Sequence, residues 1–137
     1  MIYIDSRGSG EKELYQLLQM RNLDVTRTKV ESGDIVFSGI GLERKSVRDL
    51  VSSVTSGTRH MWTQLEVLKA TYKKHGLIIE GFTNNFYKDS MLSGILYSIT
   101  VGWGIPFFPT TSIYETAELI EMLYLKSEHK GDPTCWR

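Results

Sequence analysis

The chain has 137 residues, of which 41% are hydrophobic and 23% are charged, and its formal net charge is zero. These values are typical of one globular domain and exclude a disordered chain. No apolar run reaches the roughly 18 residues that a transmembrane helix needs, and the first residues lack the basic and apolar segments of a signal peptide. The single cysteine, Cys135, has no partner for an intrachain disulfide and favours a reducing, intracellular compartment (cytoplasm or nucleus).

Hydrophobic periodicity predicts strands that alternate with helices along the whole chain. The first half reads as a strand at 1–5, a helix at 11–22, a strand at 24–30, a hairpin at 34–45 and a helix at 47–54 that Ser46 caps. The second half reads as a helix at 60–74, a buried strand at 76–81, a helix at 89–101, a short strand at 105–110 and a helix at 112–126. We therefore predict an α/β domain over 1–128, with a central mixed β-sheet flanked by helices, and a flexible tail at 129–137.

The hairpin carries the most informative charges. Strand alternation places Glu43 and Lys45 on one face and Arg44 on the other. Asp34 lies on the neighbouring strand, at the end remote from the turn. Two carboxylates on adjacent strands suit a hard cation such as Mg²⁺ or Mn²⁺, and a lysine beside them could orient water or stabilise charge on a phosphate. A solvated hairpin, in which Glu43 pairs with Lys45 at the surface, is the alternative that this spacing alone leaves open.

The full pattern of Gly33-Asp34, Glu43-Arg44-Lys45 and Asp49 reads GDx(8)ERKx(3)D. It resembles the active-site motif of the XPF-type structure-specific endonucleases, a branch of the PD-(D/E)XK nuclease superfamily that includes the archaeal Hef nuclease domain. Other stretches similar to this family follow in the same order: "IYIDSR", "SGTRHMWTQLEVLKATY", "LIIEG" and "GWGIPFFPTTSIYETAELI". The resemblance extends from about Tyr3 to Glu128 and implies a restriction-endonuclease-like nuclease fold.

The resemblance implies a role for each matched side chain of the hairpin. Asp34 and Glu43 would bind the metal, and Lys45 would be the catalytic lysine. Arg44 would also be needed for cleavage, either by tethering its strand to Asp49 or by touching phosphate. Asp49 would support the site rather than take part in the chemistry.

The residues outside the hairpin follow from the same resemblance. Asp5 falls on the family's first acid and would extend the metal and catalytic site, with Arg7 in support. Arg59 and Gln64 fall on positions near the active-site face and would contact DNA, the alternative being an exposed helix start.

One departure from the family lies beside Asp5. The family usually reads Asp-Ser-Arg-Glu, whereas this chain has Gly8 after Arg7, and the nearest acid is Glu11. Either Glu11 folds back to support the site, or a ligand is missing and activity would be weak or require Mn²⁺.

The function implied is a divalent-metal-dependent endonuclease that hydrolyses phosphodiester bonds in branched DNA (a 3′ flap, fork or nicked junction) during DNA repair or recombination. Two alternatives stay open: a dimeric nuclease that resembles Holliday-junction resolvases, and a non-catalytic DNA-binding partner of another nuclease subunit. Residues 1–74 carry 12 Lys/Arg against 9 Asp/Glu, which suits DNA on this half. The segment 91–99 is apolar on more than one stripe, so it lies either in the core or against another subunit. The resemblance favours the second interpretation and implies a homodimer or heterodimer through the carboxy-terminal half.

Overall fold

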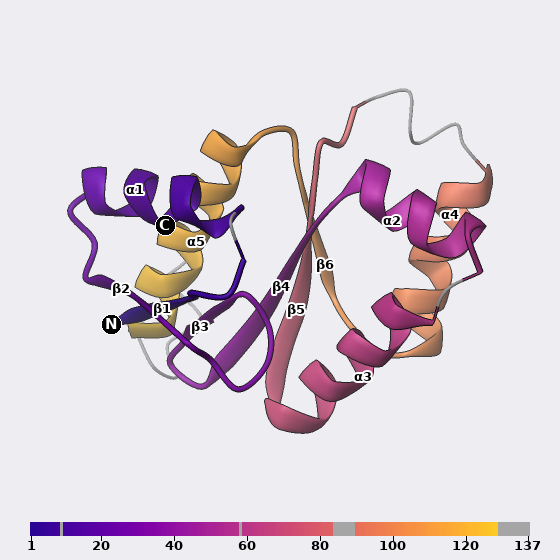
Figure 1. Ribbon diagram of the computed structural model, residues 1–137, viewed down its shortest axis with the longest axis horizontal. Helices are drawn as coiled ribbons and strands as arrows, with labels where there is room; N and C mark the ends of the chain where they lie inside the picture. The colour runs from indigo at the N-terminus through magenta and orange to yellow at the C-terminus, as the bar shows by residue number, and fades with distance from the viewer. Residues whose placement is uncertain (9, 58, 84–89, 129–137) are drawn as a thin grey trace.

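A computed structural model describes residues 1–8, 10–57, 59–83 and 90–128. Six strands form one sheet in the order β2-β1-β3-β4-β5-β6 (Figure 1). The strands are β1 (Ile2–Asp5), β2 (Val25–Thr28), β3 (Ile35–Phe37), β4 (Ile40–Ser46), β5 (Lys74–Glu80) and β6 (Phe107–Thr110). β3 pairs antiparallel with both β1 and β4, and the other neighbours pair in parallel, so the predicted mixed sheet is confirmed.

Helices cover both faces of this sheet (Figure 1). One layer is made by α1 (Glu11–Met20) and α5 (Ile113–Glu128), and the other by α2 (Val47–Thr55), α3 (His60–Thr71) and α4 (Ser90–Tyr97), which continues into a π-helical turn at Ser98–Gly102. Within the described residues, none of the helices has the length and apolar character needed to cross a membrane.

The centre of β5, Leu77–Ile79, is a continuous apolar run, and its packing shows why. Leu77 and Ile79 pack into the core beneath α2, α3 and α4, whereas Ile78 packs into the core beneath α1 and α5. All three side chains have no solvent exposure. A strand covered on both faces has no polar side to display, and its residues therefore do not alternate in polarity.

The register between β4 and β5 decides which layer each charged residue of the hairpin faces. Glu43 pairs with Leu77 and Lys45 with Ile79, whereas Arg44 pairs with Ile78. Since paired residues on neighbouring strands share a face, Glu43 and Lys45 point toward the α2–α4 layer and Arg44 toward the α1–α5 layer. The predicted division of these three charges between two faces is confirmed.

Local backbone chemistry fixes the ends of β4. The turn before it has positive φ at both central residues, 51° at Ser38 and 76° at Gly39, as tight hairpin turns require. At the other end the side chain of Ser46 accepts a hydrogen bond of 3.0 Å from the backbone N–H of Asp49, so the predicted cap of α2 is confirmed.

The apolar segment 91–99 differs from the expectation. Leu92, Ile95 and Ile99 are buried in the core, so much of the stripe that indicated a subunit interface packs inside this chain. The predicted helix is present as α4 and the π-helical turn that continues it to Gly102, and the exposed apolar residues of this region include Tyr97 and Val101, each 64% exposed. A dimer through the carboxy-terminal half stays a prediction, and the tail predicted at 129–137 lies outside the described residues.

Candidate active site

The hairpin brings its two acids face to face. Ile35 pairs with Leu42, so Asp34, immediately before β3, lies across from Glu43. The backbone N–H of Asp34 donates to the carbonyl of Leu42 at 2.8 Å, and the backbone N–H of Arg44 donates to Asp34 Oδ2 at 2.8 Å. Together these two bonds fix the carboxyl group of Asp34 beside Glu43, on the pocket that both side chains line.

Asp5 joins this pair from the end of β1. Its backbone N–H donates to the carbonyl of Asp34 at 2.9 Å, and the residue is only 7% exposed. The Asp5 carboxylate accepts from Arg7 Nε at 3.0 and 3.2 Å and from the N–H of Val30 at 3.3 Å. Arg7 also donates to the carbonyl of Val30 at 2.8 Å, so it braces the Asp5 carboxylate, and its supporting role in the site stays a prediction.

The electrostatics of the pair favour a bound cation. Burial and the nearby Asp34 raise the pKa of Glu43 to about 8, although Lys45 acts to lower it. Burial also raises the pKa of Asp34, against the hydrogen bond from the Arg44 backbone. Near neutral pH the raised pKa therefore favours the protonated form of Glu43. A divalent cation replaces such a proton favourably, because it neutralises both carboxylates at once.

The number of carboxylates also suits Mg²⁺ or Mn²⁺. Among the residues that the structure describes, no group of three or more His, Cys, Asp or Glu side chains is arranged to hold a metal ion. Mg²⁺ usually keeps several waters and binds proteins through one or two carboxylates. Asp34 and Glu43 supply that number, with Asp5 beside them, so the donor set fits such a cation.

An open pocket of about 450 Å³ lies in front of the acids. Asp5, Asp34 and Glu43 line one side, and α3 contributes His60, Thr63, Gln64 and Val67 to the other. Gln64 therefore lies at the position that the sequence predicted. Arg59 lies just before α3, is exposed, and does not line this pocket, which leaves its contact with DNA as a prediction.

Gly8 also lines the pocket, and an added Cβ at this position would meet no atom within 4 Å. Glu11 does not take the place of the acid that the family has here. Its carboxylate accepts a hydrogen bond of 2.9 Å from Arg44 Nη1, and burial together with Asp34 raises its pKa against the effect of Arg44. Glu11 thus folds back onto Arg44 and not into the pocket.

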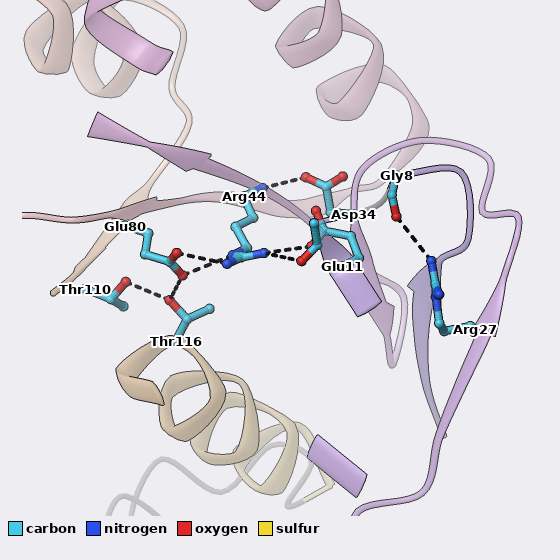
Figure 2. A network of polar contacts seen from close by, with 9 residues as sticks. Gly8, Glu11, Arg27, Asp34, Arg44, Glu80, Thr110 and Thr116 are labelled. Atoms are coloured by element: carbon cyan, nitrogen blue, oxygen red, sulfur yellow. Dashed lines mark hydrogen bonds and ion pairs between the residues drawn. The ribbon is translucent and has the colours of Figure 1, made fainter. Parts of the chain in front are cut away.

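Arg44 is the centre of a polar network on the other face of β4 (Figure 2). Its guanidinium group binds Glu80 through Nε at 3.0 Å and through Nη2 at 2.8 Å, in addition to Glu11. The expected tether to Asp49 is wrong, because the contacts of Arg44 lie in the α1–α5 layer, whereas Asp49 is exposed in the first turn of α2. The alternation of side chains along β4 makes the two faces exclusive.

Sequence reasoning missed the rest of this network. Glu80 accepts a hydrogen bond of 2.7 Å from Thr116 Oγ1, which lies 2.7 Å from Thr110 Oγ1. A signal for Glu80 was available, since it is the acid that directly follows the buried apolar run Leu77–Ile79 of β5. Thr116 gave no such signal, because its partners are set only by the packing of α5 on the sheet.

The fold and the site together define a class of protein. A mixed sheet covered on both faces, with an acidic pair and a lysine on adjacent central strands, is the architecture of restriction-endonuclease-like nuclease domains. The ERCC4 domain model matches residues 4–123, and the chain belongs to the ERCC4 domain family, that of the XPF nucleases.

Two named relatives illustrate this membership. The chain is 32% identical over 135 residues to the DNA repair endonuclease XPF of Dictyostelium discoideum, covering 83% of this chain and 14% of that protein. It is 27% identical over 127 residues to the 3′-flap repair endonuclease Xpf of Saccharolobus solfataricus, covering 89% of this chain and 53% of that protein. The chain thus spans about half the length of one relative and a small part of the other.

The structure of XPF from Aeropyrum pernix has the same fold. It superposes with a TM-score of 0.80 at 23% identity and covers 95% of this chain and 62% of that one. Its complex with DNA gives a TM-score of 0.79 at 22% identity and covers 97% of this chain and 68% of that one. The predicted α/β nuclease fold is therefore confirmed.

Proposed function

We propose that this chain is a divalent-metal-dependent endonuclease domain that hydrolyses phosphodiester bonds in branched DNA, such as a 3′ flap, a fork or a nicked junction, in DNA repair or recombination. The observation that carries the proposal is the half-buried pair of Asp34 and Glu43, whose side chains line one side of an open pocket. Membership of the ERCC4 domain family supports it, as do the names of the two relatives and the DNA in the Aeropyrum complex.

Asp34 and Glu43 would hold Mg²⁺ or Mn²⁺, with Asp5 completing or supporting the site. When bound, such a cation activates water and neutralises charge on the phosphate. Lys45 lies close enough to Glu43 to influence its pKa, and its ammonium group would stabilise the charge that develops on the phosphate oxygens. Arg7 keeps the Asp5 carboxylate in place.

The wall of the pocket formed by α3 would receive the DNA. Gln64 lines it with uncharged hydrogen-bonding groups, and Arg59 at the start of α3 would add a positive charge at its edge. Side chains of this kind contact the sugar-phosphate backbone without reading sequence, which suits an enzyme that recognises a branch by its shape.

The test is cleavage of end-labelled 3′-flap, fork, four-way junction and plain duplex DNA with Mg²⁺ or Mn²⁺. Lys45→Ala should abolish cleavage at the branch, and Lys12→Ala, on the exposed side of α1, should leave it unchanged. Cleavage that does not require a divalent cation, or that Lys45→Ala retains, would contradict the proposal. Paired symmetric cuts across a four-way junction would instead establish the resolvase-like alternative.

Gly8 favours one further candidate, a non-catalytic partner subunit. The pocket has open space where the family carries a glutamate, so one acid fewer faces the cation. Branched DNA bound with no cleavage under any metal condition would establish this role and overturn the nuclease proposal.

A further inference from the structure

We propose that Glu80 is a positioning residue of the nuclease site, acting through Arg44 and fixed by Thr116 of α5. The inference rests on the proposed function, in that the group positioned is the candidate metal ligand Asp34. It assigns Arg44 an indirect role, in which its side chain braces β4 from behind while its backbone N–H holds the Asp34 carboxylate at 2.8 Å.

The contacts of the Arg44 side chain leave little capacity for a phosphate. A guanidinium group has five N–H donors. Two bind Glu80 through Nε and Nη2, and one of the two on Nη1 binds Glu11 at 2.9 Å (Figure 2). The other donor on Nη1 faces the carbonyl of Gly10 at 3.2 Å. The side chain is 13% exposed and lies on the face of β4 opposite to Glu43. Arg44 therefore contributes to the site through its backbone, and its side chain sets where that backbone lies.

Of the two acids that bind Arg44, Glu80 fixes it more tightly. The pair is bidentate, the arrangement that adds direction as well as attraction. Glu80 and Glu11 outweigh the effect of burial and raise the pKa of Arg44, so the guanidinium group stays charged. Glu80 also ends β5, the strand that pairs in parallel with β4 over seven residues, so its carboxylate is carried by the centre of the sheet.

Thr116 and Thr110 fix Glu80 in turn. Both threonines are nearly inaccessible to solvent, with 0% and 2% exposure. Since Thr116 spends its single hydroxyl proton on Glu80, Thr110 must be the donor to Thr116, and the chain of hydrogen bonds points toward the carboxylate. α5 is thereby connected to Asp34 through Thr116, Glu80 and Arg44 without any contact with the pocket.

The most direct test measures amide hydrogen exchange at Arg44 by NMR, which needs neither cation nor DNA. Glu80→Gln keeps the shape of the side chain but removes its charge, and Thr116→Val removes the hydroxyl at constant volume. Each should speed exchange of the Arg44 amide, by about tenfold or more for Glu80→Gln, because a charge-assisted hydrogen bond is weakened. Thr116→Ser retains the hydroxyl and should restore the slow exchange.

Glu121→Gln is the matched control. Glu121 also pairs with an arginine, Arg21, and that pair likewise joins α1 to α5, but it makes no contact with β4. This variant should change thermal stability at most and leave the Arg44 amide as protected as in the wild type. Equal exchange rates at Arg44 in folded Glu80→Gln, Glu121→Gln and the wild type would overturn the proposal.

Measurements of activity and of cation binding then distinguish a positioning role of Glu80 from an effect on the stability of the fold alone. Loss of an outer partner of a metal ligand costs about 10- to 100-fold in metal affinity or activity. Glu80→Gln should therefore lower Mn²⁺ affinity, measured by calorimetry, and kcat, while KM for DNA stays within about twofold. If kcat and KM of folded Glu80→Gln match the wild type, the positioning role fails and the nuclease proposal stands. If the wild type cuts no DNA but its Arg44 exchange and Mn²⁺ affinity depend on Glu80, the positioning role stands and the nuclease proposal fails.

Discussion

The surroundings of Glu43 disfavour its ionised form, so the stability of the folded protein should depend on pH. Burial and Asp34 raise its pKa from 4.5 to about 8. Between these two values the unfolded chain has released the proton and the folded chain retains it, so the stability of the metal-free protein falls as pH rises from about 4.5 to about 8. For one proton the slope is at most about 1.4 kcal/mol per pH unit.

Urea unfolding at a series of pH values, in the presence of a chelator, checks this expectation. Glu43→Gln has no carboxyl group to titrate and should remove the falling component from the curve, while Glu13→Gln, an exposed acid on α1, should not. Mn²⁺ added at pH 8 should stabilise the wild type and have little effect on Glu43→Gln. Parallel curves for the wild type and Glu43→Gln would show that Glu43 does not hold the proton.

Position 8 is where we expect a single substitution to raise the affinity for a metal ion. It lines the pocket beside Asp5 and has open space where a side chain would grow. Gly8→Glu should therefore raise Mg²⁺ affinity by about tenfold, since affinity for hard cations rises with the number of charged ligands. Ser6→Glu adds the same charge two residues away, outside the pocket, and should leave the affinity unchanged. Calorimetric titration of Mg²⁺ measures both, and an unchanged affinity in Gly8→Glu would place the cation elsewhere.

Gly33 immediately precedes Asp34, and both its backbone conformation and its close neighbours favour glycine. Its φ is +82°, and an added Cβ would lie 2.9 Å from Leu68 Cδ1 and 3.1 Å from the carbonyl oxygen of Leu42. Gly33→Ala should therefore destabilise the protein by about 1–3 kcal/mol through backbone strain plus the clash with β4. Gly39 has a similar φ of +76°, but a Cβ added there would meet no atom within 4 Å. Gly39→Ala should therefore lose stability through backbone strain alone. Urea unfolding compares the two variants, and equal losses would show that the neighbouring atoms move to relieve the clash at position 33.

At the scale of elements, some features of this fold were predictable from local chemistry and others were not. The hairpin was predictable because Ser38-Gly39 suits a tight turn, and the capped start of α2 was predictable from Ser46. The burial of the segment 91–99 was not, since periodicity alone does not separate a helix inserted in the core from one that faces a partner. The partner of Arg44 was not predictable either, because Glu80 lies 36 residues away and meets it only through the pairing of β4 with β5.

At the scale of the whole molecule, the candidate site was also predictable only in the part that depends on local strand pairing. Residues of one motif, such as Asp34 and Glu43, were placed together by strand pairing, which sequence reveals. The network behind them joins β4, β5, α1 and α5, and only the packed molecule brings these elements together (Figure 2). The two faces of the sheet thus divide the work proposed for this chain, with the acids and pocket on one side and the brace on the other.

The assembly of two molecules is the last expectation to test. The carboxy-terminal half still exposes apolar side chains on the α4 side, including Tyr97 and Val101, although most of the predicted stripe is buried. If a second subunit packs here, Val101→Asp should shift sedimentation toward the monomer, because it places a charge in a desolvated contact. Tyr114→Asp is the control, since Tyr114 is 63% exposed on α5, which covers the opposite face of the sheet (Figure 1). Analytical ultracentrifugation over a range of concentrations distinguishes the two, and a monomeric wild type or an unchanged Val101→Asp dimer would contradict an interface at α4.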